Sequence, residues 1–383
     1  MASSATSEGP GIFTRLRLAS PKTSVSKEPN ALRIGILGAA NIAPDALINP
    51  AKLMRDIVVV SVAARDENKA KAYAARYGIP NTHPSYDALL SDPAIDCIYN
   101  PLPNGLHFEW TQKALQAGKH VLLEKPSASN ATQTKKLFEL AKEKNLILLE
   151  AYHYRFHPAS TFFRDLIQQH VKEGYPLTRL YSRMTLGTIF PADDIRFQYS
   201  LAGGVFMDCG SYTVNATRFF SGLEIESIES ATPKIIGEQV DGRMDVIANM
   251  KTPQPLQDGQ KLQASLMASL TDPWLSFKTW KQLFPMFIAE TDAKIFTFGV
   301  WVMPNLYHYM TVKDKATGKS ETIKRYDSGH STYYYQLEAF VKAIKSGGND
   351  IQSIPGWVSG EDSVANMEVI DKVYLKAGLK VRE

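Results

Sequence analysis

The chain has 383 residues, a length typical of two domains. Hydrophobic residues make up 44% and charged residues 21%, the composition of an ordinary globular protein. The net charge of +4 is small, and no basic cluster is interleaved with aromatic residues, which argues against nucleic acid as a partner. No apolar run approaches the roughly 18 residues of a membrane span. The two cysteines, Cys97 and Cys209, exclude a disulfide framework and a cysteine-rich metal site, and we predict no metal.

Residues 1–30 differ in composition from the rest of the chain. This segment is rich in serine, proline and small residues, which predicts a disordered or loosely attached tail. Its basic residues with few acids also leave open an organelle transit peptide. We favour a plain extension of a cytoplasmic protein, and the segment lacks the long apolar core of a secretory signal. Two cysteines in 383 residues suit a reducing, intracellular setting.

Residues 31–152 alternate between short apolar runs and segments of helical length. The apolar runs predict buried strands at 32–38, 57–64, 94–100, 119–125 and 146–151. The segments between them predict helices at 66–78, 105–117 and 130–144. This alternation indicates an α/β domain of the Rossmann type, with a parallel, doubly wound sheet covered on both faces. Ligands bind such sheets at the carboxyl ends of the strands.

A small-residue loop follows the first strand. It reads GAANIA and keeps one glycine, Gly38, of the Gly-x-Gly-x-x-Gly dinucleotide pattern. Alanines fill the other two places, and small side chains still let backbone N–H groups approach a pyrophosphate. We therefore predict that Gly38, Ala40, Asn41 and Ile42 contact a dinucleotide.

The end of the second strand bears on the choice of cofactor. Enzymes for NAD usually place an acid there to bind the ribose hydroxyls, whereas here Ala64 is followed by Arg65. A guanidinium can bind a 2′-phosphate with two hydrogen bonds, so we predict NADP in preference to NAD. An arginine stacked on adenine would suit either cofactor, and Asp66 stands next to it.

A lysine ends the strand at 119–125. The sequence 121-VLLEKPSAS-129 turns from apolar to polar at Glu124 and Lys125. A lysine that merely reaches solvent is ordinary at the end of a strand. The carboxyl end of a parallel strand faces the ligand crevice, however, so Lys125 becomes a candidate catalytic residue.

Residues 153–383 predict an α+β domain with a large, mostly antiparallel open sheet. The pattern gives strands at 179–188, 225–235, 243–251, 261–270, 285–290, 294–300 and 306–313. Hairpin-like breaks fall at 252–260 and 314–320, and helices are expected near 159–172, 204–220, 331–346 and 360–377. An open sheet leaves one face to be covered, and we expect a homodimer to form through it.

Two segments of this domain carry candidate substrate-binding residues. Asp208 and Tyr212 are four residues apart and should share one face of the helix near 204–220. A carboxylate and a phenol can handle a proton and a hydroxyl-rich ligand, although a core tyrosine beside a surface acid would look the same. Tyr154 and Arg155 follow the last parallel strand and suit a sugar pocket, with a structural pairing as the alternative.

Six segments occur in the order found in the Gfo/Idh/MocA oxidoreductases, which the chain resembles over roughly residues 32–380: GILGAANIA, AARDENKAKAYA, PLPNGLHFEW, LLEKP, EAYHYRFHP and GGVFMDCGSY. The resemblance looks closest to the branch of D-xylose 1-dehydrogenase and dimeric dihydrodiol dehydrogenase. Inositol dehydrogenase-like members carry a histidine where this chain has Tyr212.

The resemblance implies hydride transfer between an alcohol or lactol carbon and a nicotinamide. It makes Lys125 and Tyr212 the catalytic pair, with the lysine bringing a tyrosine pKa of about 10 towards working pH. It assigns Glu124 to the cofactor, Asp208 to a substrate hydroxyl, and Arg196 more weakly to the pocket. It further places five residues on the nicotinamide side: Asn100, Pro101, Leu102, Asn104 and His107.

Four functions follow from these expectations. The first is NADP-dependent oxidation of an aldose such as D-xylose to its lactone. The second is a trans-dihydrodiol dehydrogenase or dicarbonyl reductase with a different pocket. The third is a reductase of secondary metabolism, whose apolar pocket the aromatic residues at 274–287 could widen, although the same residues suit the core of a sheet equally well. The fourth is a non-catalytic dinucleotide-binding regulator, against which the retention of Lys125 and Tyr212 argues.

Overall fold

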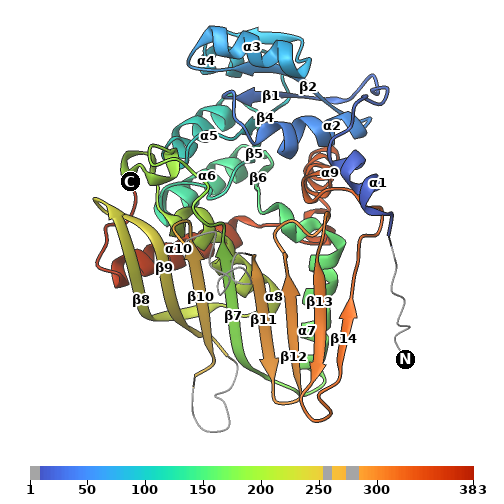
Figure 1. Ribbon diagram of the computed structural model, residues 1–383. Helices are drawn as coiled ribbons and strands as arrows, with labels where there is room; N and C mark the ends of the chain where they lie inside the picture. Colours follow the sequence, from blue (N-terminus) through green and yellow to red (C-terminus); the bar gives the residue numbers. More distant parts are fainter. Residues whose placement is uncertain (1–8, 253–260, 273–283) are drawn as a thin grey trace. The chain divides into compact units, whose positions relative to one another are not determined.

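The computed structural model describes residues 9–252, 261–272 and 284–383 (Figure 1). The chain divides into two compact units. The first, the parallel-sheet unit, comprises residues 10–157 and 328–364. The second, the mixed-sheet unit, contains residues 158–327 and 365–383. The expected single division near residue 152 therefore differs from the observed one, because residues 328–364 return to the parallel-sheet unit.

The parallel-sheet unit is built on six parallel strands in the order β3-β2-β1-β4-β5-β6. Their bounds are β1 Leu32–Leu37, β2 Ile57–Ala63, β3 Asn81–His83, β4 Cys97–Asn100, β5 His120–Leu123 and β6 Leu148–Glu150. The five strands expected from apolar runs are confirmed. The sequence missed β3, since its three residues are polar and none of them is fully buried.

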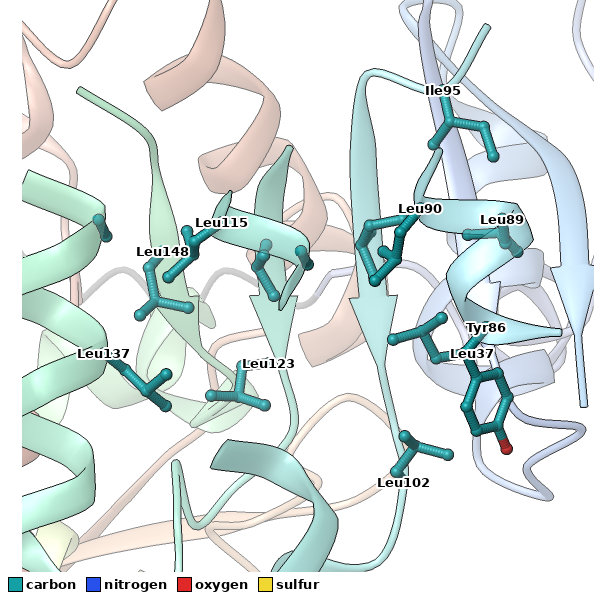
Figure 2. Close-up of a cluster of buried hydrophobic side chains, with 14 of the residues drawn as sticks. Leu37, Tyr86, Leu89, Leu90, Ile95, Leu102, Leu115, Leu123, Leu137 and Leu148 are labelled. Atoms are coloured by element: carbon teal, nitrogen blue, oxygen red, sulfur yellow. The ribbon is translucent and has the colours of Figure 1, made fainter. Parts of the chain in front are cut away.

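Helices lie between the strands of this unit: α2 Asn49–Leu53, α3 Glu67–Tyr77, α4 Tyr86–Leu90, α5 His107–Gln116 and α6 Ala131–Glu143. The sequence sets the ends of α3 by local chemistry. The Asp66 carboxylate accepts hydrogen bonds from two backbone N–H groups of the first turn, and Gly78 ends the helix with φ 71°. Leucines of the strands and of α5 and α6 form a buried core that Figure 2 shows, among them Leu115, Leu123, Leu137 and Leu148.

The N-terminal segment is not a loose tail where the structure describes it. Helix α1 spans Ile12–Ala19, and the chain after it pairs with the parallel-sheet unit. The backbone N–H groups of Val25 and Glu28 donate to the carbonyls of Lys52 and Arg55, both at 2.8 Å. The prediction of disorder for residues 9–30 was therefore wrong. Composition alone could not reveal these bonds, because their partners lie about 27 residues further along the chain.

The mixed-sheet unit contains eight strands in the order β14-β13-β12-β11-β7-β10-β9-β8. The bounds are β7 Leu177–Thr185, β8 Ile225–Gly237, β9 Val240–Met250, β10 Gln263–Ser269, β11 Met286–Thr291, β12 Lys294–Gly299, β13 Tyr309–Asp314 and β14 Ser320–Ile323. All neighbours pair antiparallel except β7 and β10. The predicted antiparallel α+β domain is confirmed, although the short β14 was missed. The expected break at 252–260 and most of the aromatic segment at 274–287 lie outside the described residues.

Two helices, α7 Pro158–Lys172 and α8 Ser211–Ser221, pack together against one face of this sheet (Figure 1). Aromatic rings fill the interface, since Phe163 of α7 lies edge-on to Phe220 of α8 and to Phe287 of β11. On the other face the side chains of Tyr181, Met267 and Ile288 are only half-buried.

The remaining helices complete the described chain. They are η1 Pro44–Ile48, η2 Asn104–Leu106, η3 His153–Phe156, η4 Ile195–Phe197, η5 Tyr199–Leu201, η6 Phe206–Gly210, η8 Ile351–Ser353, α9 Thr332–Lys345 and α10 Gly360–Lys376. Two of them, η1 and η6, are π-helical turns, which occur often at functional sites. Within the described residues, no helix has the length and apolar character to traverse a bilayer.

Candidate active site

The loop after β1 is a tight turn that needs glycine. Gly38 has φ +91°, and a Cβ there would stand 3.0 Å from the Leu102 side chain. Its N–H donates to the Ala63 carbonyl of β2 at 2.7 Å. From α3, the Tyr73 hydroxyl donates to the Ala40 carbonyl at 2.9 Å. Both neighbours thus hold the loop, while its next residues, Asn41 and Ile42, are exposed.

Arg65 follows β2 and lies beside the same loop. Burial raises the pKa of the Tyr86 hydroxyl, and the charge and backbone N–H of Arg65 oppose that rise, so the two residues are neighbours. The Tyr86 oxygen is in turn 3.9 Å from the position of a Cβ on Gly38. The segments that follow β1, β2 and β3 therefore bring Gly38, Arg65 and Tyr86 together. Figure 2 shows Tyr86 and Leu102 at this end of the core.

The side chain of Asn100, at the end of β4, is used within the protein. It is fully buried, donates to the Thr111 hydroxyl at 3.0 Å and accepts the Leu102 N–H at 3.3 Å. Pro101 and Asn104 are half-buried in the loop that follows. We therefore interpret Asn100 as a residue that shapes this loop, with the loop residues themselves left as candidates for cofactor contact.

His107 begins α5 and is buried, with both ring nitrogens facing backbone oxygens. Nδ1 lies 2.7 Å from the Pro126 carbonyl and Nε2 lies 2.6 Å from the Leu102 carbonyl. Burial and, to a smaller extent, the charge of Lys125 lower the pKa of His107 to about 4, although the two carbonyls oppose that fall. The sequence predicted that His107 contacts a cofactor, whereas both of its ring nitrogens face backbone carbonyls of the protein. His107 instead connects two backbone loops.

The segment Glu124–Ser127, which we call the lysine turn, follows β5. Its peptide bond between Lys125 and Pro126 is cis. The Glu124 N–H donates to the Asn100 carbonyl at 3.0 Å, and the Glu124 carboxylate accepts from the Tyr99 hydroxyl at 2.6 Å. Lys125 itself is half-buried. Burial lowers the pKa of His153, and the charge of Lys125 adds to that fall as it does for His107, so the ammonium lies near both rings.

Glu150 holds the other end of the lysine turn. Its carboxylate is fully buried at the end of β6 and accepts the Ser127 N–H at 2.7 Å. Burial raises the pKa of Glu150 from 4.5 to about 7. Ser127, Ser363 and the charge of Arg155 oppose that rise, and the charge of Asp362 adds to it. The sequence prediction missed this residue, although Glu150 ends an apolar strand, which is the position that made Lys125 a candidate.

Arg155 and Tyr154 lie in η3 and are both buried. The Arg155 guanidinium donates to the carbonyls of Gly356 and Trp357, at 3.1 and 2.9 Å, and pairs with Asp362. These bonds use its donors to tie residues 356–362 to η3. Arg155 therefore makes the structural pairing that the sequence left open as an alternative to a sugar pocket. Neither Arg155 nor the fully buried Tyr154 is included in the proposed substrate site.

One pair of histidines has the four-residue spacing typical of zinc ligands, His153 and His157. His153 lies in the 3-10 turn η3, with its Nδ1 2.8 Å from the Thr332 hydroxyl. His157 lies edge-on to the Tyr335 ring. Across the described part of the chain, no group of three or more His, Cys, Asp or Glu residues is arranged to hold a metal ion.

In the mixed-sheet unit, two candidate substrate residues bind each other. Arg196 donates through Nε to the Asp208 carboxylate at 2.9 Å and through Nη1 to Asp194 at 3.0 Å. Its guanidinium also lies 4.1 Å above the Phe190 ring. The side chains of Arg196 and Asp208 are 33% and 16% exposed, so the pair faces a partly open surface.

Tyr212 lies in the first turn of α8, directly after η6. Because η6 is π-helical and contains Asp208, the two residues lie on successive turns of one continuous helical segment. Tyr212 is 5% exposed, and its ring lies 6.2 Å from Trp301 in an edge-on arrangement. The predicted helix is confirmed, and the sequence gave no signal for its π-helical first part.

The start of this helical segment depends on two glycines and a buried ion pair. A Cβ on Gly203 would stand 2.7 Å from the Arg196 carbonyl oxygen, and a Cβ on Gly204 would stand 2.3 Å from the Asp241 carboxylate. Asp241 is fully buried, accepts the Phe206 N–H at 2.8 Å and pairs with the fully buried Arg382 at 3.2 Å. These contacts fix the point at which the segment with Asp208 begins.

A parallel sheet in 3-2-1-4-5-6 order, with a glycine turn after β1 and a cationic side chain after β2, defines a Rossmann dinucleotide-binding unit. The Gfo/Idh/MocA family, described as oxidoreductases with an NAD-binding Rossmann fold, matches residues 32–152. The chain is 32% identical over 348 residues to a D-xylose 1-dehydrogenase (NADP(+)) of Haloferax volcanii, covering 90% of this chain and 97% of the relative. The protein therefore belongs to the Gfo/Idh/MocA family and is an NAD(P)-dependent oxidoreductase.

Other relatives match about half of their own length. A dTDP-3,4-didehydro-2,6-dideoxy-alpha-D-glucose 3-reductase of Saccharopolyspora spinosa is 40% identical over 190 residues, 49% of this chain and 56% of the relative. A trans-1,2-dihydrobenzene-1,2-diol dehydrogenase of Xenopus tropicalis is 34% identical over 200 residues, 52% and 59% respectively. The fold matches a 3-ketoreductase of Actinomadura kijaniata bound to NADP and TDP-benzene, with a TM-score of 0.74 at 24% identity over 91% of this chain and 98% of that one.

Proposed function

We propose that the protein is an NADP-dependent dehydrogenase that transfers a hydride between the nicotinamide and a carbon of a sugar. Its most concrete form is the oxidation of an aldose such as D-xylose at the anomeric carbon to a lactone. The observation that carries the proposal is the lysine turn, which presents Lys125 at the carboxyl end of β5 in a dinucleotide-binding sheet. The similarity to the xylose dehydrogenase of Haloferax volcanii over nearly its whole length supports the choice of substrate.

The residues after β1 and β2 fit a dinucleotide. A Cβ on Gly38 would meet Leu102, so glycine keeps this turn narrow, and the small residues after it leave backbone N–H groups accessible to a pyrophosphate. Arg65 is an exposed cation beside this turn and can bind a 2′-phosphate, which supports NADP over NAD. The loop residues Pro101, Leu102 and Asn104, together with Glu124, would hold the nicotinamide side.

The proposed mechanism gives each candidate residue a separate role. When bound, the nicotinamide supplies the site that accepts or returns the hydride. In the proposed mechanism the Lys125 ammonium donates a hydrogen bond to the reacting oxygen, where negative charge develops. Tyr212 removes or returns the proton of that oxygen as the general base or acid. Asp208 accepts a hydrogen bond from a neighbouring sugar hydroxyl, and Arg196 orients Asp208 through their ion pair.

Two other substrates have support. The similarity to dihydrodiol dehydrogenases favours oxidation of a cyclic trans-diol, and the similarity to dTDP-sugar 3-reductases favours reduction of a ketone on a larger substrate. Both reactions would use the same lysine and tyrosine. A regulator without catalysis has less support, because a sensor has no need of a hydride-transfer pair.

We further propose a homodimer that forms through the open face of the mixed sheet, in a cytoplasmic protein. The half-buried Tyr181, Met267 and Ile288 give this face an apolar centre. Ile288→Asp should convert the dimer to a monomer in light scattering. Leu375→Asp, at a highly exposed position of α10, is the matched control and should leave the mass unchanged.

The experiment that tests the proposed function is NADP⁺ reduction against a panel of aldoses, trans-dihydrodiols and sugar nucleotides, followed by the absorbance of NADPH, with NAD⁺ in parallel. Turnover of a pentose or hexose with NADP⁺ supports the proposal. Turnover of a diol alone moves the assignment to the second substrate class. Tight NADPH binding without turnover of any panel member contradicts the aldose dehydrogenase.

A further inference from the structure

The lysine turn is held from both strands that neighbour β5. On the β4 side, His107 contacts the Pro126 carbonyl. On the β6 side, Glu150 accepts the Ser127 N–H. We propose that Glu150 and His107 are positioning residues that fix the lysine turn from its two sides and thereby set the direction of the Lys125 ammonium. This inference rests on the proposed function, which makes Lys125 the catalytic cation.

Burying the Glu150 carboxyl group costs free energy, so a contribution to stability alone does not account for it. A carboxylate without solvent contact loses several kcal/mol of hydration unless hydrogen bonds and opposite charge replace it. Its register with Leu123 of β5 leaves it level with the last residue of that strand. From there its carboxylate reaches the Ser127 N–H, two residues beyond Lys125. A buried carboxyl group therefore stands where it restrains the backbone that carries the proposed catalytic side chain.

His107 extends the same restraint to the cofactor loop. Its two nitrogens lie between the carbonyls of Leu102 and Pro126, and Leu102 is the residue that a Cβ on Gly38 would meet. A neutral imidazole donates one hydrogen bond, and the protonated ring donates two. In either form the ring fills the space between the two loops, so a movement of one loop is passed to the other.

The turn has little freedom left. Tyr99 and Asn100 hold Glu124, His107 holds Pro126, and Glu150 holds Ser127, so three of its four residues have a bond from a neighbouring element. Lys125 lies among them with its long side chain. A displacement of about 1 Å at a reacting group can cost roughly 100-fold in rate, so small changes in this backbone should affect turnover before they affect binding.

The test compares Glu150→Ala and Glu150→Gln with a matched pair at Asp92. The Asp92 carboxylate also accepts a backbone N–H, that of Ala94 at 2.7 Å, but it precedes β4 and so lies at the amino ends of the strands. We expect Glu150→Ala to lower kcat by about 10- to 100-fold with KM for NADP⁺ within about threefold. Glu150→Gln keeps an acceptor oxygen and should recover most of kcat. Asp92→Ala and Asp92→Asn should keep kcat within about twofold.

A second readout does not require turnover. Acetic anhydride labels lysine amines in the folded protein, and mass spectrometry gives the rate at Lys125 relative to that at the exposed Lys144. Release of the turn should raise this ratio at least about threefold in Glu150→Ala and in His107→Ala, and less in His107→Gln, whose amide can still donate. The Asp92 variants should leave the ratio unchanged. If Glu150→Ala does not fold, Glu150→Asp keeps the charge and withdraws the oxygen from Ser127.

The two readouts separate the possible failures. An unchanged labelling ratio in the Glu150 and His107 variants overturns the positioning role, whatever the substrate. Equal losses of kcat at Glu150 and Asp92, in proportion to lost stability, also overturn it. If the wild type turns over no panel substrate but the labelling ratio rises as expected, the proposed function fails and the positioning of Lys125 stands.

Discussion

The lysine turn and the pair of Arg196 and Asp208 are held in different ways. The lysine turn is fixed mainly by bonds to its backbone, from a buried carboxylate and a buried imidazole. Arg196 and Asp208 are joined through their side chains, and the arginine side chain is 33% exposed. The restraint on the turn is shared among several neighbouring residues, whereas the partly exposed ion pair is lost with one substitution.

This difference agrees with the different requirements of cofactor binding and substrate binding. A turn that must serve one cofactor gains from rigidity, because it repeats the same geometry in every cycle. A substrate pocket gains from side chains that can be exchanged without disturbing the fold. The relatives fit this view, since enzymes named for xylose, dTDP-sugars and dihydrodiols are all similar in sequence to this chain.

The largest effect should come from the lysine itself. We expect Lys125→Met to lower kcat by about 10³- to 10⁴-fold, or roughly 4 to 5.5 kcal/mol of barrier, because the cation that stabilises the reacting oxygen is removed. NADPH affinity, measured by fluorescence, should stay within about tenfold. Lys144→Met, at an exposed position of the same unit, is the control. Complete loss of cofactor binding would contradict the catalytic assignment.

The second largest effect should fall on stability in the mixed-sheet unit. Arg382→Met leaves the Asp241 carboxylate buried without its ion pair, and we expect the free energy of unfolding to fall by about 3–5 kcal/mol. Arg33→Met breaks the more exposed pair with Asp96 and should cost at most about 1 kcal/mol. Urea denaturation measures both. Equal losses of unfolding free energy in the two variants would show that the pair of Asp241 and Arg382 does not anchor the helical segment that contains Asp208.

The third prediction concerns pH. The pKa of Glu150 is about 7 in the folded protein and near 4.5 when the chain is unfolded, so the folded state holds the proton more tightly. This residue favours folding below about pH 4.5, and its contribution is lost as the pH rises through 7. The loss amounts to about 3 kcal/mol at most. Glu150→Gln should remove this fall in stability between pH 5 and 8, and a parallel fall in variant and wild type would refute it.

A smaller effect is expected for cofactor choice. Arg65→Ala should weaken NADPH binding by about 1–3 kcal/mol, because a charge-assisted contact with the 2′-phosphate is lost. NADH has no such phosphate and should bind nearly as before. Fluorescence titrations with both cofactors measure the difference. Similar losses for the two would remove the argument for NADP.

The smallest effect should be at the exposed pair. Arg196→Met frees Asp208 to reorient, and we expect KM for the sugar to rise about tenfold, or roughly 1.4 kcal/mol. The affinity for NADPH and the unfolding free energy should change little, since the pair is partly solvated. Steady-state kinetics with the active sugar measure this. A large loss of stability would mean that this pair and the lysine turn are held in the same way.

The sequence predicted the fold well because its signals are local. Continuous apolar runs mark the strands of the parallel sheet, and the caps at Asp66 and Gly78 mark the ends of a helix. Lys125, Arg65 and Asp208 could be selected because strand ends and helix faces are readable from spacing. The bond between Arg196 and Asp208 could not be read, although both residues were selected.

The rest depends on contacts between distant segments. Nothing in the residues near Glu150 states that its carboxylate reaches Ser127, or that Asp241 meets Arg382, 141 residues later. The expected disorder of the N-terminal segment failed for the same reason, because its partners are residues 51–55. His107 was selected as a cofactor contact from the family pattern, whereas both of its nitrogens face backbone carbonyls.

The return of residues 328–364 to the parallel-sheet unit has a consequence for protein synthesis. The bonds from Arg155 to Gly356, Trp357 and Asp362 cannot form until more than nine-tenths of the chain has left the ribosome. Domains usually fold as they emerge, the first before the second. Here residues 158–327 of the mixed-sheet unit are translated before residues 328–364 complete the parallel-sheet unit. The parallel-sheet unit therefore cannot finish folding until most of the mixed-sheet unit has been synthesised.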